Sequence, residues 1–393
     1  MKVAIVHDWL TTYTGAEKVV EQILKIYPQA DLFTLVDFLK GDDRTFLKGI
    51  KITTSFIQKM PFSKKKYRNY LPLMPLAIEQ FDLSEYDLVI SSSHAVAKGV
   101  ITGPDQIHIS YIHTPIRYAW DLQHQYLKES RLNKGIKSYI TRTILHYIRL
   151  WDFRTSAGVD IMLSNSNFIK KRIKKIYNRE AITVYPPVDV SLFEYQDDKQ
   201  DYYLTASRLV PYKKVDLIVE AFSKFPNKTL YVIGDGPDME KIKAIQSTNV
   251  RLLGYQSSEN LKKFMQNAKA FIFAAEEDFG ITPLEAQACG TPVIAYGKGG
   301  ALETVKGDIH TEDELTGLFF YEQTVDSLIA AVEKFELIQN KILAINCRNH
   351  ALKFSNERFC EEFSQLIEQS ILDKSIKTDK KEKPTENKLE LFI

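Results

Sequence analysis

Two carboxylates flank a glycine turn in the second half of the chain. Glu277 and Glu285 stand on either side of Gly280, shortly after the apolar run Ala270–Ala275. Gly280 lets the backbone pass close to a ligand, and Thr282 is expected to cap the helix that follows. The exposed amides and the partial positive charge at the start of that helix suit a phosphate. The segment therefore predicts an anion site with two carboxylates beside it.

Glu285 also has a purely structural interpretation. Thr282 and Glu285 have the spacing of a capping box, in which Glu285 would only return a hydrogen bond to the Thr282 amide. Glu277, at the end of the preceding strand, favours the ligand-binding interpretation, because both carboxylates would then lie on the ligand side of the sheet.

Arg208 and Lys213 form a basic pair in the loop after the expected strand Tyr202–Ala206. A surface pair of this kind is usually just solvated. Ligands of open α/β sheets bind beyond the carboxyl ends of the strands, however. We therefore expect this loop to lie at the same edge of the sheet as Glu277 and Glu285.

The elements that must position these residues alternate between strand and helix. In the first half, short apolar runs are expected to be strands: Val3–Trp9, Asp31–Val36, Asp87–Ser91, His108–Ile112 and Asp160–Ser164. The pattern restarts after the paired prolines Pro186 and Pro187, with expected strands at Tyr202–Ala206, Thr229–Ile233, Val250–Leu253, Ala270–Ala275 and Pro292–Tyr296. This alternation favours parallel sheets covered by helices. We therefore predict an α/β protein of two Rossmann-like, doubly wound domains that face a cleft.

The domain boundaries follow from the same pattern. We expect a first domain over residues 1–187 and a second over residues 188–353. Residues 354–372 are expected to form a C-terminal helix that packs back on the first domain. Residues 373–393 have mixed charge and little apolar content, which predicts a disordered tail.

Composition places the chain among ordinary globular proteins. Of its 393 residues, 44% are hydrophobic and 26% are charged. The sequence has no run of 18 apolar residues, so we expect no transmembrane helix, and we expect no signal peptide. Three scattered cysteines favour neither a disulfide framework nor a zinc site, so we expect a cytoplasmic protein with no metal.

The two halves differ in charge. Up to Pro187 the chain has 27 Lys/Arg against 17 Asp/Glu, and from Val188 onward it has 25 against 33. Three basic segments with interleaved aromatic residues account for the excess: Lys59–Tyr70, Arg131–Arg154 and Phe168–Arg179. Such segments suit anionic lipid headgroups, although a lysine-rich face is often only solvated. No nucleic-acid motif accompanies them, so we expect a peripheral contact with the inner face of the cell membrane and no nucleic acid.

Several motifs together resemble the signature of the retaining glycosyltransferases of family 4, which have the GT-B fold. The first is Glu277-x7-Glu285 with the internal Phe279-Gly280, followed by Ala288-Cys289-Gly290-Thr291-Pro292. The others are Arg208-x4-Lys213, Gly234-Asp235-Gly236-Pro237, Leu253-Gly254-Tyr255, His7-Asp8-Trp9-Leu10, His113-Thr114-Pro115 and Tyr185-Pro186-Pro187. The resemblance extends over roughly residues 1–370.

The resemblance implies roles for individual residues. Arg208 and Lys213 would neutralise the donor diphosphate, Glu285 would bind the ribose, and Glu277 would bind the transferred sugar. Amides of Phe279, Gly280, Ile281 and Thr282 would hold sugar and phosphate, with Gly15 approaching from the first domain. Gly234 and Tyr255 would belong to nucleotide-binding loops, and His113 would position the sugar or stabilise charge. The first domain would bind the acceptor and the second the nucleotide sugar.

The resemblance also implies an activity. The sequence of the Glu277–Pro283 segment is similar to the corresponding segment of bacterial mannosyltransferases of polysaccharide assembly, such as those of lipopolysaccharide or capsule. We therefore expect a metal-independent hexosyltransferase with GDP-mannose as donor and a lipid-linked saccharide as acceptor. A UDP-sugar remains the second donor. A nucleotide-sugar epimerase and a non-catalytic nucleotide-sugar-binding protein remain alternatives of another class.

Overall fold

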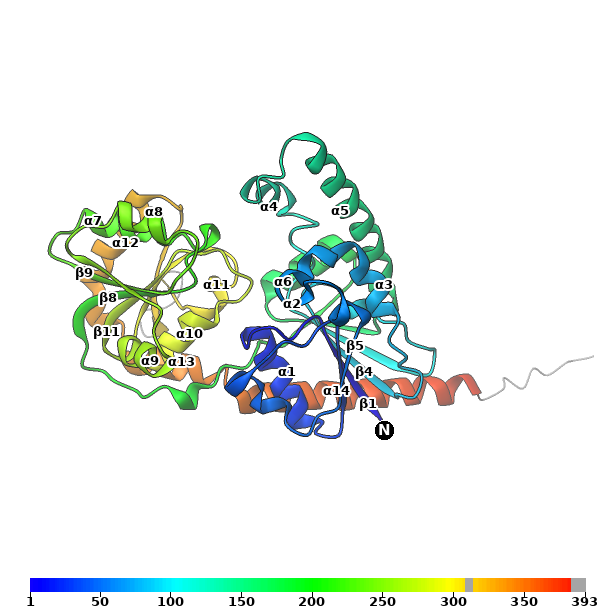
Figure 1. The fold of residues 1–393 in the computed structure, drawn as a ribbon. Helices are drawn as coiled ribbons and strands as arrows, with labels where there is room; N and C mark the ends of the chain where they lie inside the picture. Colours follow the sequence, from blue (N-terminus) through cyan, green and yellow to red (C-terminus); the bar gives the residue numbers. More distant parts are fainter. Residues whose placement is uncertain (308–313, 383–393) are drawn as a thin grey trace, which may run out of the picture.

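Two parallel sheets, each covered by helices, form two domains that lie side by side (Figure 1). The computed structural model describes residues 1–307 and 314–382. One sheet has seven strands in the order β3-β2-β1-β4-β5-β6-β7, and the other has six in the order β10-β9-β8-β11-β12-β13. Neighbouring strands pair in parallel in both. The predicted α/β fold with two doubly wound parallel sheets is confirmed.

The first sheet and its helices occupy the N-terminal half. Its strands are β1 (Val3–His7), β2 (Asp31–Thr34), β3 (Ile52–Thr54), β4 (Leu88–Ser93), β5 (Ile107–Ile112), β6 (Ile161–Ser164) and β7 (Ile182–Thr183). Its α-helices are α1 (Gly15–Ile26), α2 (Ser63–Lys66), α3 (Met74–Glu79), α4 (Gln123–Glu129), α5 (Gly135–Thr155) and α6 (Asn167–Tyr177). Short 3₁₀ helices include η2 (Phe56–Lys59), η3 (Tyr67–Leu73) and η4 (Ala97–Gly99).

The second sheet follows the paired prolines. Its strands are β8 (Gln200–Ala206), β9 (Thr229–Ile233), β10 (Val250–Gly254), β11 (Ala268–Phe273), β12 (Val293–Tyr296) and β13 (Gly317–Phe320). Its helices are η7 (Pro211–Lys213), α7 (Val215–Ser223), α8 (Met239–Ala244), α9 (Ser258–Asn267), α10 (Ile281–Ala288), α11 (Ala301–Thr304), α12 (Val325–Ile338) and α13 (Ala344–Leu352). A long helix, α14 (Asn356–Glu382), ends the described chain.

The central strands are buried on both faces. Every residue of β1, β4 and β5 is buried. Helices cover both sides of such a sheet, so its strands read as continuous apolar runs and not as alternating ones. Some polar side chains, among them His7 and Ser92, lie at or near the carboxyl ends of these strands.

Helix α14 leaves the second domain and packs on the first. Phe359, Phe363 and Ile367 are fully buried in one cluster with Ile5 and Val19. Figure 1 shows the helix running beneath the first domain, alongside α1. Burial of two phenylalanines and an isoleucine contributes roughly 1.5–3 kcal/mol each. The helix continues to Glu382, past the predicted end at residue 372, and residues 383–393 of the predicted disordered tail lie outside the described residues.

Helix α10 begins earlier than expected. Its cap is Gly280, with a φ of 91°, and Thr282 already lies within the helix. The prediction that Thr282 caps this helix was therefore wrong. Only glycine adopts such a positive φ at little cost, so the turn itself, and not a side-chain cap, sets the start of the helix.

Candidate active site

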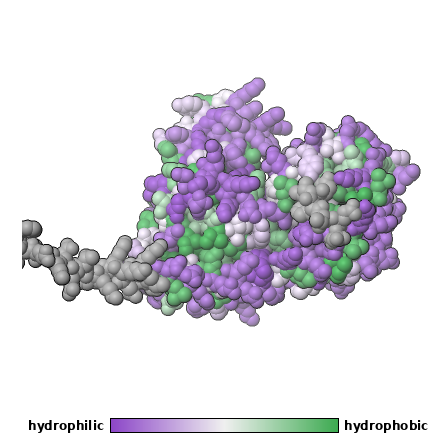
Figure 2. Space-filling view, turned by 180° about the vertical axis from the view of Figure 1, so that it is seen from behind, coloured by the Kyte–Doolittle hydropathy of each residue, from purple (hydrophilic) through white to green (hydrophobic). Residues whose placement is uncertain are grey.

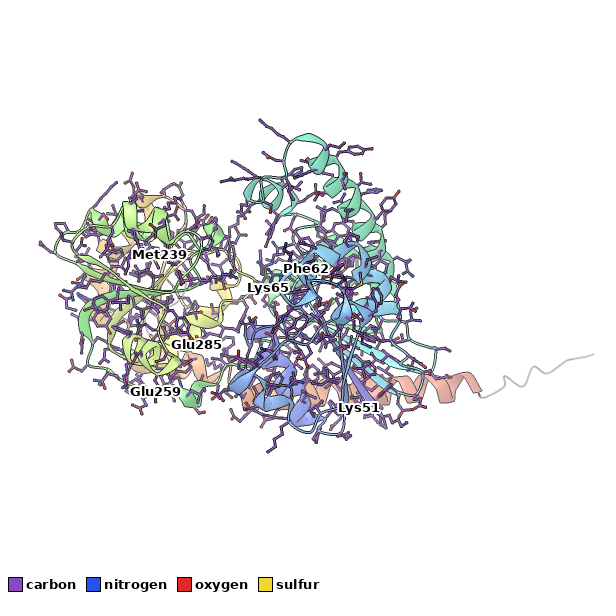
Figure 3. The ribbon with its side chains drawn as sticks, in the orientation of Figure 1. Lys51, Phe62, Lys65, Met239, Glu259 and Glu285 are labelled. Carbon is purple, nitrogen blue, oxygen red and sulfur yellow. The ribbon has the colours of Figure 1, made fainter. Side chains whose placement is uncertain are left out.

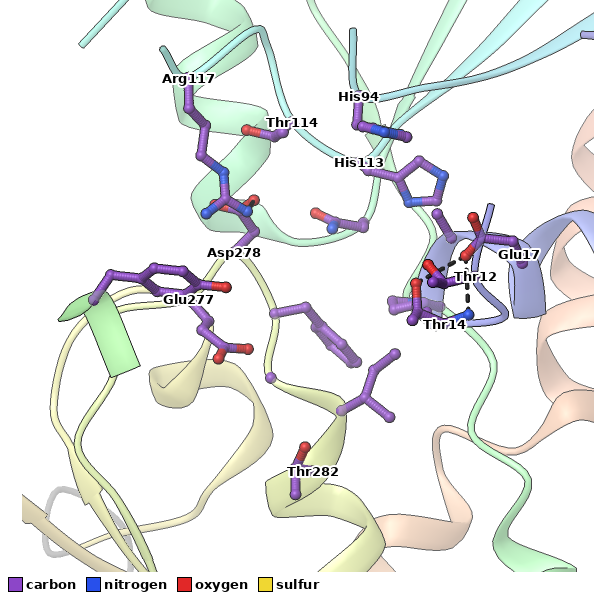
Figure 4. A pocket seen from close by; sticks show the side chains of 18 of the residues that line it. Thr12, Thr14, Glu17, His94, His113, Thr114, Arg117, Glu277, Asp278 and Thr282 are labelled. Carbon is purple, nitrogen blue, oxygen red and sulfur yellow. Dashed lines mark hydrogen bonds and ion pairs between the residues drawn. The ribbon is translucent and has the colours of Figure 1, made fainter. Parts of the chain in front are cut away.

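A cavity of about 530 Å³ lies between the two domains, at the carboxyl ends of both sheets. Figure 2 shows the hollow between the two lobes from behind, in a surface where hydrophilic residues predominate. Figure 4 shows residues of the first domain on one side of the cavity and residues of the second domain on the other. Eight of the residues predicted for the site line it: Gly15, His113, Lys213, Glu277, Phe279, Gly280, Ile281 and Thr282.

Two helix starts adjoin at this cavity. α10 begins at Ile281 and α1 begins at Gly15. A Cβ atom added at Gly15 would lie 2.8 Å from Cδ1 of Ile281, so the two turns approach within van der Waals distance. The first amides of a helix have no partner within the helix and carry partial positive charge. Amides from both helix starts therefore line the same cavity, where they could bind an anion.

The second domain also places a lysine and a glutamate in the cavity. Lys213, at the end of η7, donates a hydrogen bond to Oε1 of Glu277, which follows β11. Their side chains are 16% and 20% exposed, so both remain accessible from the cavity. Lys213 can therefore leave Glu277 for a phosphate, and Glu277 can bind sugar hydroxyls, without either side chain having to leave a buried core.

The first-domain wall contains a buried chain of polar groups. Oε1 of Glu17 lies 3.5 Å from Nε2 of His7, and Nδ1 of His7 lies 3.1 Å from Oγ of Ser92. Oγ of Ser92 in turn lies 2.8 Å from Nε2 of His113. We call this series of polar contacts the Glu17–His113 relay. It runs from helix α1 to His113, whose side chain lines the cavity. It fixes the ring of His113 through its far nitrogen.

The protonation states along the relay differ. Burial raises the pKa of Glu17, but the His7 imidazolium and hydrogen bonds from Thr14 outweigh it and lower that pKa to about 2. Burial lowers the pKa of His7, but the Glu17 carboxylate outweighs it and raises that pKa above its ordinary value. Burial, together with the charges of His94 and His7, lowers the pKa of His113 to about 3. His113 is therefore neutral at neutral pH and can orient a hydroxyl without carrying charge.

Asp8 holds the loop that carries His94. Its carboxylate accepts hydrogen bonds from the four consecutive amides of His94 to Ala97 at 2.6–2.9 Å. Burial raises the pKa of Asp8, but the charges of His94 and His7 and these amides outweigh it, so the pKa is lowered. The ionised Asp8 therefore fixes the η4 turn below the cavity.

Four predicted site residues lie outside this cavity. Arg208 is exposed and lines a neighbouring cavity. Gly234 packs against the Ser207 carbonyl, where a Cβ atom would come within 1.8 Å of the oxygen. Tyr255 is 82% exposed, beyond the lining of the cavity.

Glu285 is the fourth of these residues, and it forms an ion pair across the cleft. Its Oε1 lies 3.1 Å from Nζ of Lys18, which belongs to helix α1 of the first domain. In Figure 3 Glu285 lies on the side of the second domain that faces the first. The capping-box alternative, in which Glu285 bonds only to Thr282, is therefore not what the structure shows.

Further contacts between the domains surround the cavity. Asp278 bonds to Arg117, and its Oδ1 lies 3.0 Å from Nη1 of Arg172. Glu303 accepts hydrogen bonds from the backbone amides of Asn167 and Phe168 at the start of α6, at 2.7 and 2.9 Å. These groups hold the two walls of the cavity together.

Sequence reasoning missed Glu17, Ser92, Lys18 and Asp278. Glu17 had a signal, since Thr14 and Glu17 have the spacing of a capping box, and the Thr14 amide donates to Glu17 at 3.0 Å. Asp278 sits inside the recognised motif. Lys18 and Ser92 had no local signal, because their partners come from other elements.

The described residues contain no group of three or more His, Cys, Asp or Glu side chains that could hold a metal ion. Over the same residues, no helix combines the length and the apolar character needed to cross a membrane.

The family model described as "Glycosyl transferases group 1" matches residues 193–353. Among curated proteins, the chain is 27% identical over 280 residues to the alpha-1,3/1,6-mannosyltransferase ALG2 of Saccharomyces cerevisiae, covering 56% of this chain and 55% of the relative. It is 26% identical over 223 residues to the GDP-mannose-dependent alpha-(1-6)-phosphatidylinositol monomannoside mannosyltransferase of Mycobacterium tuberculosis, covering 49% and 56%. The chain thus spans about half the length of these curated relatives.

Solved structures resemble the whole described fold. Anabaena HepE in complex with UDP superposes with a TM-score of 0.67 at 16% identity, covering 94% of this chain and 100% of that one. Sucrose-phosphate synthase from Thermosynechococcus elongatus superposes with a TM-score of 0.69 at 16% identity, covering 95% and 100%. The chain therefore has the GT-B fold expected from the resemblance of its motifs.

Proposed function

We propose that this chain, whose residues 193–353 form a group 1 glycosyltransferase domain, moves a hexose from a nucleotide sugar to a saccharide acceptor. The observation that carries the proposal is the pair of helix starts, those of α1 and α10, on one cavity that also holds Lys213 and Glu277. Two named mannosyltransferases among the relatives favour mannose from GDP-mannose as the donor group. A UDP-sugar is the second candidate, because HepE was solved with UDP.

The donor would lie in the cavity, against the two helix starts that line it. Amides at Gly15 and at Gly280–Ile281 would hold the diphosphate, and Lys213 would exchange Glu277 for a phosphate oxygen. Glu277, released from the lysine, would accept hydrogen bonds from the sugar hydroxyls. Glu285 would leave Lys18 for the ribose hydroxyls, and the freed ammonium would add to the positive charge facing the diphosphate.

The reaction would be a substitution at the anomeric carbon with retained configuration. The bond from that carbon to the diphosphate oxygen breaks while the acceptor oxygen bonds to the same face. The leaving diphosphate takes the proton of the acceptor hydroxyl. Lys213, the helix amides and the nearby Arg208 would stabilise the charge that develops on the diphosphate, and neutral His113 would orient the sugar. These positive groups would replace the divalent metal that other transferases use.

The acceptor would be a lipid-linked saccharide at the inner face of the cell membrane. Phe62, 79% exposed, lies beside the lysines of α2 on the first domain, and Figure 3 places Phe62 and Lys65 on the same part of that domain. Tyr139 and Tyr147 on α5 are 74% and 66% exposed. Exposed aromatic and basic side chains together suit an anionic lipid surface.

Sedimentation with vesicles tests the membrane contact. We expect the full chain to sediment with phosphatidylglycerol vesicles at low salt, and not with neutral phosphatidylcholine vesicles. Equal or absent binding to both would contradict the membrane contact and leave the transferase activity in place.

Incubation of the chain with membranes and radiolabelled nucleotide sugars tests the activity. Transfer from GDP-mannose into the lipid fraction is the expected result. Label that appears in an isomerised soluble nucleotide sugar would indicate an epimerase. Binding of the donor with no change in the label would indicate a non-catalytic nucleotide-sugar-binding protein.

A further inference from the structure

A second cavity, of about 650 Å³, opens beside the first. The two cavities share an aromatic wall formed by Trp9, Tyr118, Tyr126 and Tyr212. We call the second cavity the side chamber. It lies between η3 and α3, the α4–α5 hairpin and the loop after β8, on the side of the cleft where that hairpin projects in Figure 1. Its volume is within the range of sites for small molecules.

The aliphatic end of the side chamber is formed by side chains that do not line the first cavity. The side chains there come from both domains: Leu71, Met74, Leu127, Leu132, Leu145 and Val210. An open cavity lined by aliphatic groups keeps apolar surface in contact with water, which is unfavourable until an apolar group covers it. A sugar ring alone would leave these side chains uncovered, because its hydroxyls need polar partners.

Two arginines that line the side chamber, Arg68 and Arg208, have no acidic partner and form no ion pair among the described residues. Nε of Arg68 donates a hydrogen bond of 3.2 Å to Oη of Tyr67, and its guanidinium makes a cation–π contact with the same ring. Both guanidinium groups are exposed. Guanidinium groups free of carboxylates suit a phosphate, which they can bind through two parallel hydrogen bonds.

We infer that the side chamber binds the apolar end of the acceptor, an alkyl or isoprenoid chain joined to the acceptor sugar through a phosphate. The chain fills the aliphatic end, the phosphate lies at Arg68, and the sugar rests on the aromatic wall beside the donor. Arg68 and the aromatic wall line both cavities, so a phosphate at Arg68 would place the attached sugar where the side chamber meets the donor cavity. The inference rests on the proposed function, since it assigns the second substrate of the same site.

Titration calorimetry on the full chain tests this assignment with three probes: geranyl phosphate, geraniol and inorganic phosphate. Geranyl phosphate carries both features that the side chamber recognises. We expect its Kd to be at least about tenfold lower than that of either single-feature probe, because the apolar and anionic contacts act together. Inorganic phosphate that binds as tightly as geranyl phosphate would overturn the assignment.

Two pairs of variants locate the binding. Leu132→Asn changes the aliphatic end, while Ile136→Asn changes a residue of the same hairpin that is 77% exposed and outside the chamber. Arg68→Gln removes the guanidinium, and Lys64→Gln removes a charge from the exposed surface. We expect Leu132→Asn and Arg68→Gln to raise the Kd for geranyl phosphate at least fivefold, and the two controls to leave it within twofold. Equal Kd values in all four variants would overturn the assignment.

Donor binding separates this inference from the proposed function. A thermal shift with GDP-mannose, measured on wild type and Leu132→Asn, is expected to be the same, and it also shows that the variant is folded. If GDP-mannose shifts the melting temperature but geranyl phosphate does not bind, the side-chamber assignment fails and the proposed function stands. If geranyl phosphate binds and no nucleotide sugar does, the proposed function fails.

Discussion

The two walls of the cleft hold their charges differently. In the first domain, Glu17, His7 and Asp8 are buried and find all their charged partners within that domain. In the second domain, Lys213 and Glu277 are partly exposed and pair with each other at the cavity. The first wall is therefore set before a ligand arrives. We call it the preset wall. The second wall, called the exchangeable wall, consists of charges that can leave each other to bind a ligand.

Lys213→Ala probes the exchangeable wall and should have the largest effect. Loss of the ammonium removes charge stabilisation from the leaving diphosphate and leaves Glu277 unpaired in the cavity. We expect turnover to fall by roughly 10²- to 10³-fold, measured as transfer of radiolabelled sugar. Lys224→Ala, at an exposed position of the same domain, is the control. Turnover in Lys213→Ala within twofold of this control would contradict the role of the lysine.

Glu17→Gln probes the preset wall. The substitution leaves His7 buried without its counter-charge, and we expect the free energy of unfolding in urea to fall by about 3 kcal/mol at pH 6. The raised pKa of His7 means that its charge stabilises the fold at pH 6 and that this contribution is lost as the pH rises through the raised value. The pKa of Glu17 is lowered to about 2, so its carboxylate stays ionised from pH 6 to pH 9. The loss should therefore be smaller at pH 9 than at pH 6.

Glu361→Gln, an exposed position on α14, is the control for Glu17→Gln. Its free energy of unfolding should match that of the wild type at both pH values. A loss in Glu17→Gln that is equal at pH 6 and pH 9 would contradict a charged His7 in the folded chain.

Arg208→Ala tests a charge that stands beside the exchangeable wall but not in it. Arg208 lines the side chamber and lacks an acidic partner among the described residues. We expect turnover to fall by roughly 10- to 100-fold, less than for Lys213→Ala, since the guanidinium is exposed and farther from the donor cavity. Arg251→Ala, exposed on β10, is the matched control. A larger loss in Arg208→Ala than in Lys213→Ala would reverse this order.

Removal of divalent metal should have the smallest effect. The positive groups proposed for the diphosphate come from Lys213 and the two helix starts, so transfer activity should be unchanged after dialysis against EDTA. The assay is run in parallel with added Mg²⁺ or Mn²⁺. Activity that depends strictly on either ion would contradict the metal-independent site.

The site residues that could be predicted are those whose positions follow from the parallel sheets. Gly15, His113, Lys213 and Glu277 each come shortly after a strand, and parallel strands bring such positions to one edge. The long apolar strands were predicted for the same reason. The strands β3 and β7 were not, because three and two residues carry too little periodicity, and the four-residue strand β13 was missed as well.

The parts that could not be predicted depend on how the two domains meet. The Lys18–Glu285 pair joins residues 267 positions apart, and Asp278 finds Arg172 on a helix of the other domain. No local pattern encodes such pairs, since they form only after both sheets are folded and docked. The cap of α10 at Gly280 depends on a left-handed turn that the Thr282–Glu285 spacing obscured. The roles of the site residues in catalysis stay predictions.

A crystal structure of the chain with GDP-mannose would locate the donor. We expect the diphosphate in the cavity against the first amides of α1 and α10, Lys213 on a phosphate oxygen and Glu277 on the sugar. A nucleotide bound elsewhere, with Lys213 still on Glu277 and Lys18 still on Glu285, would contradict this expectation.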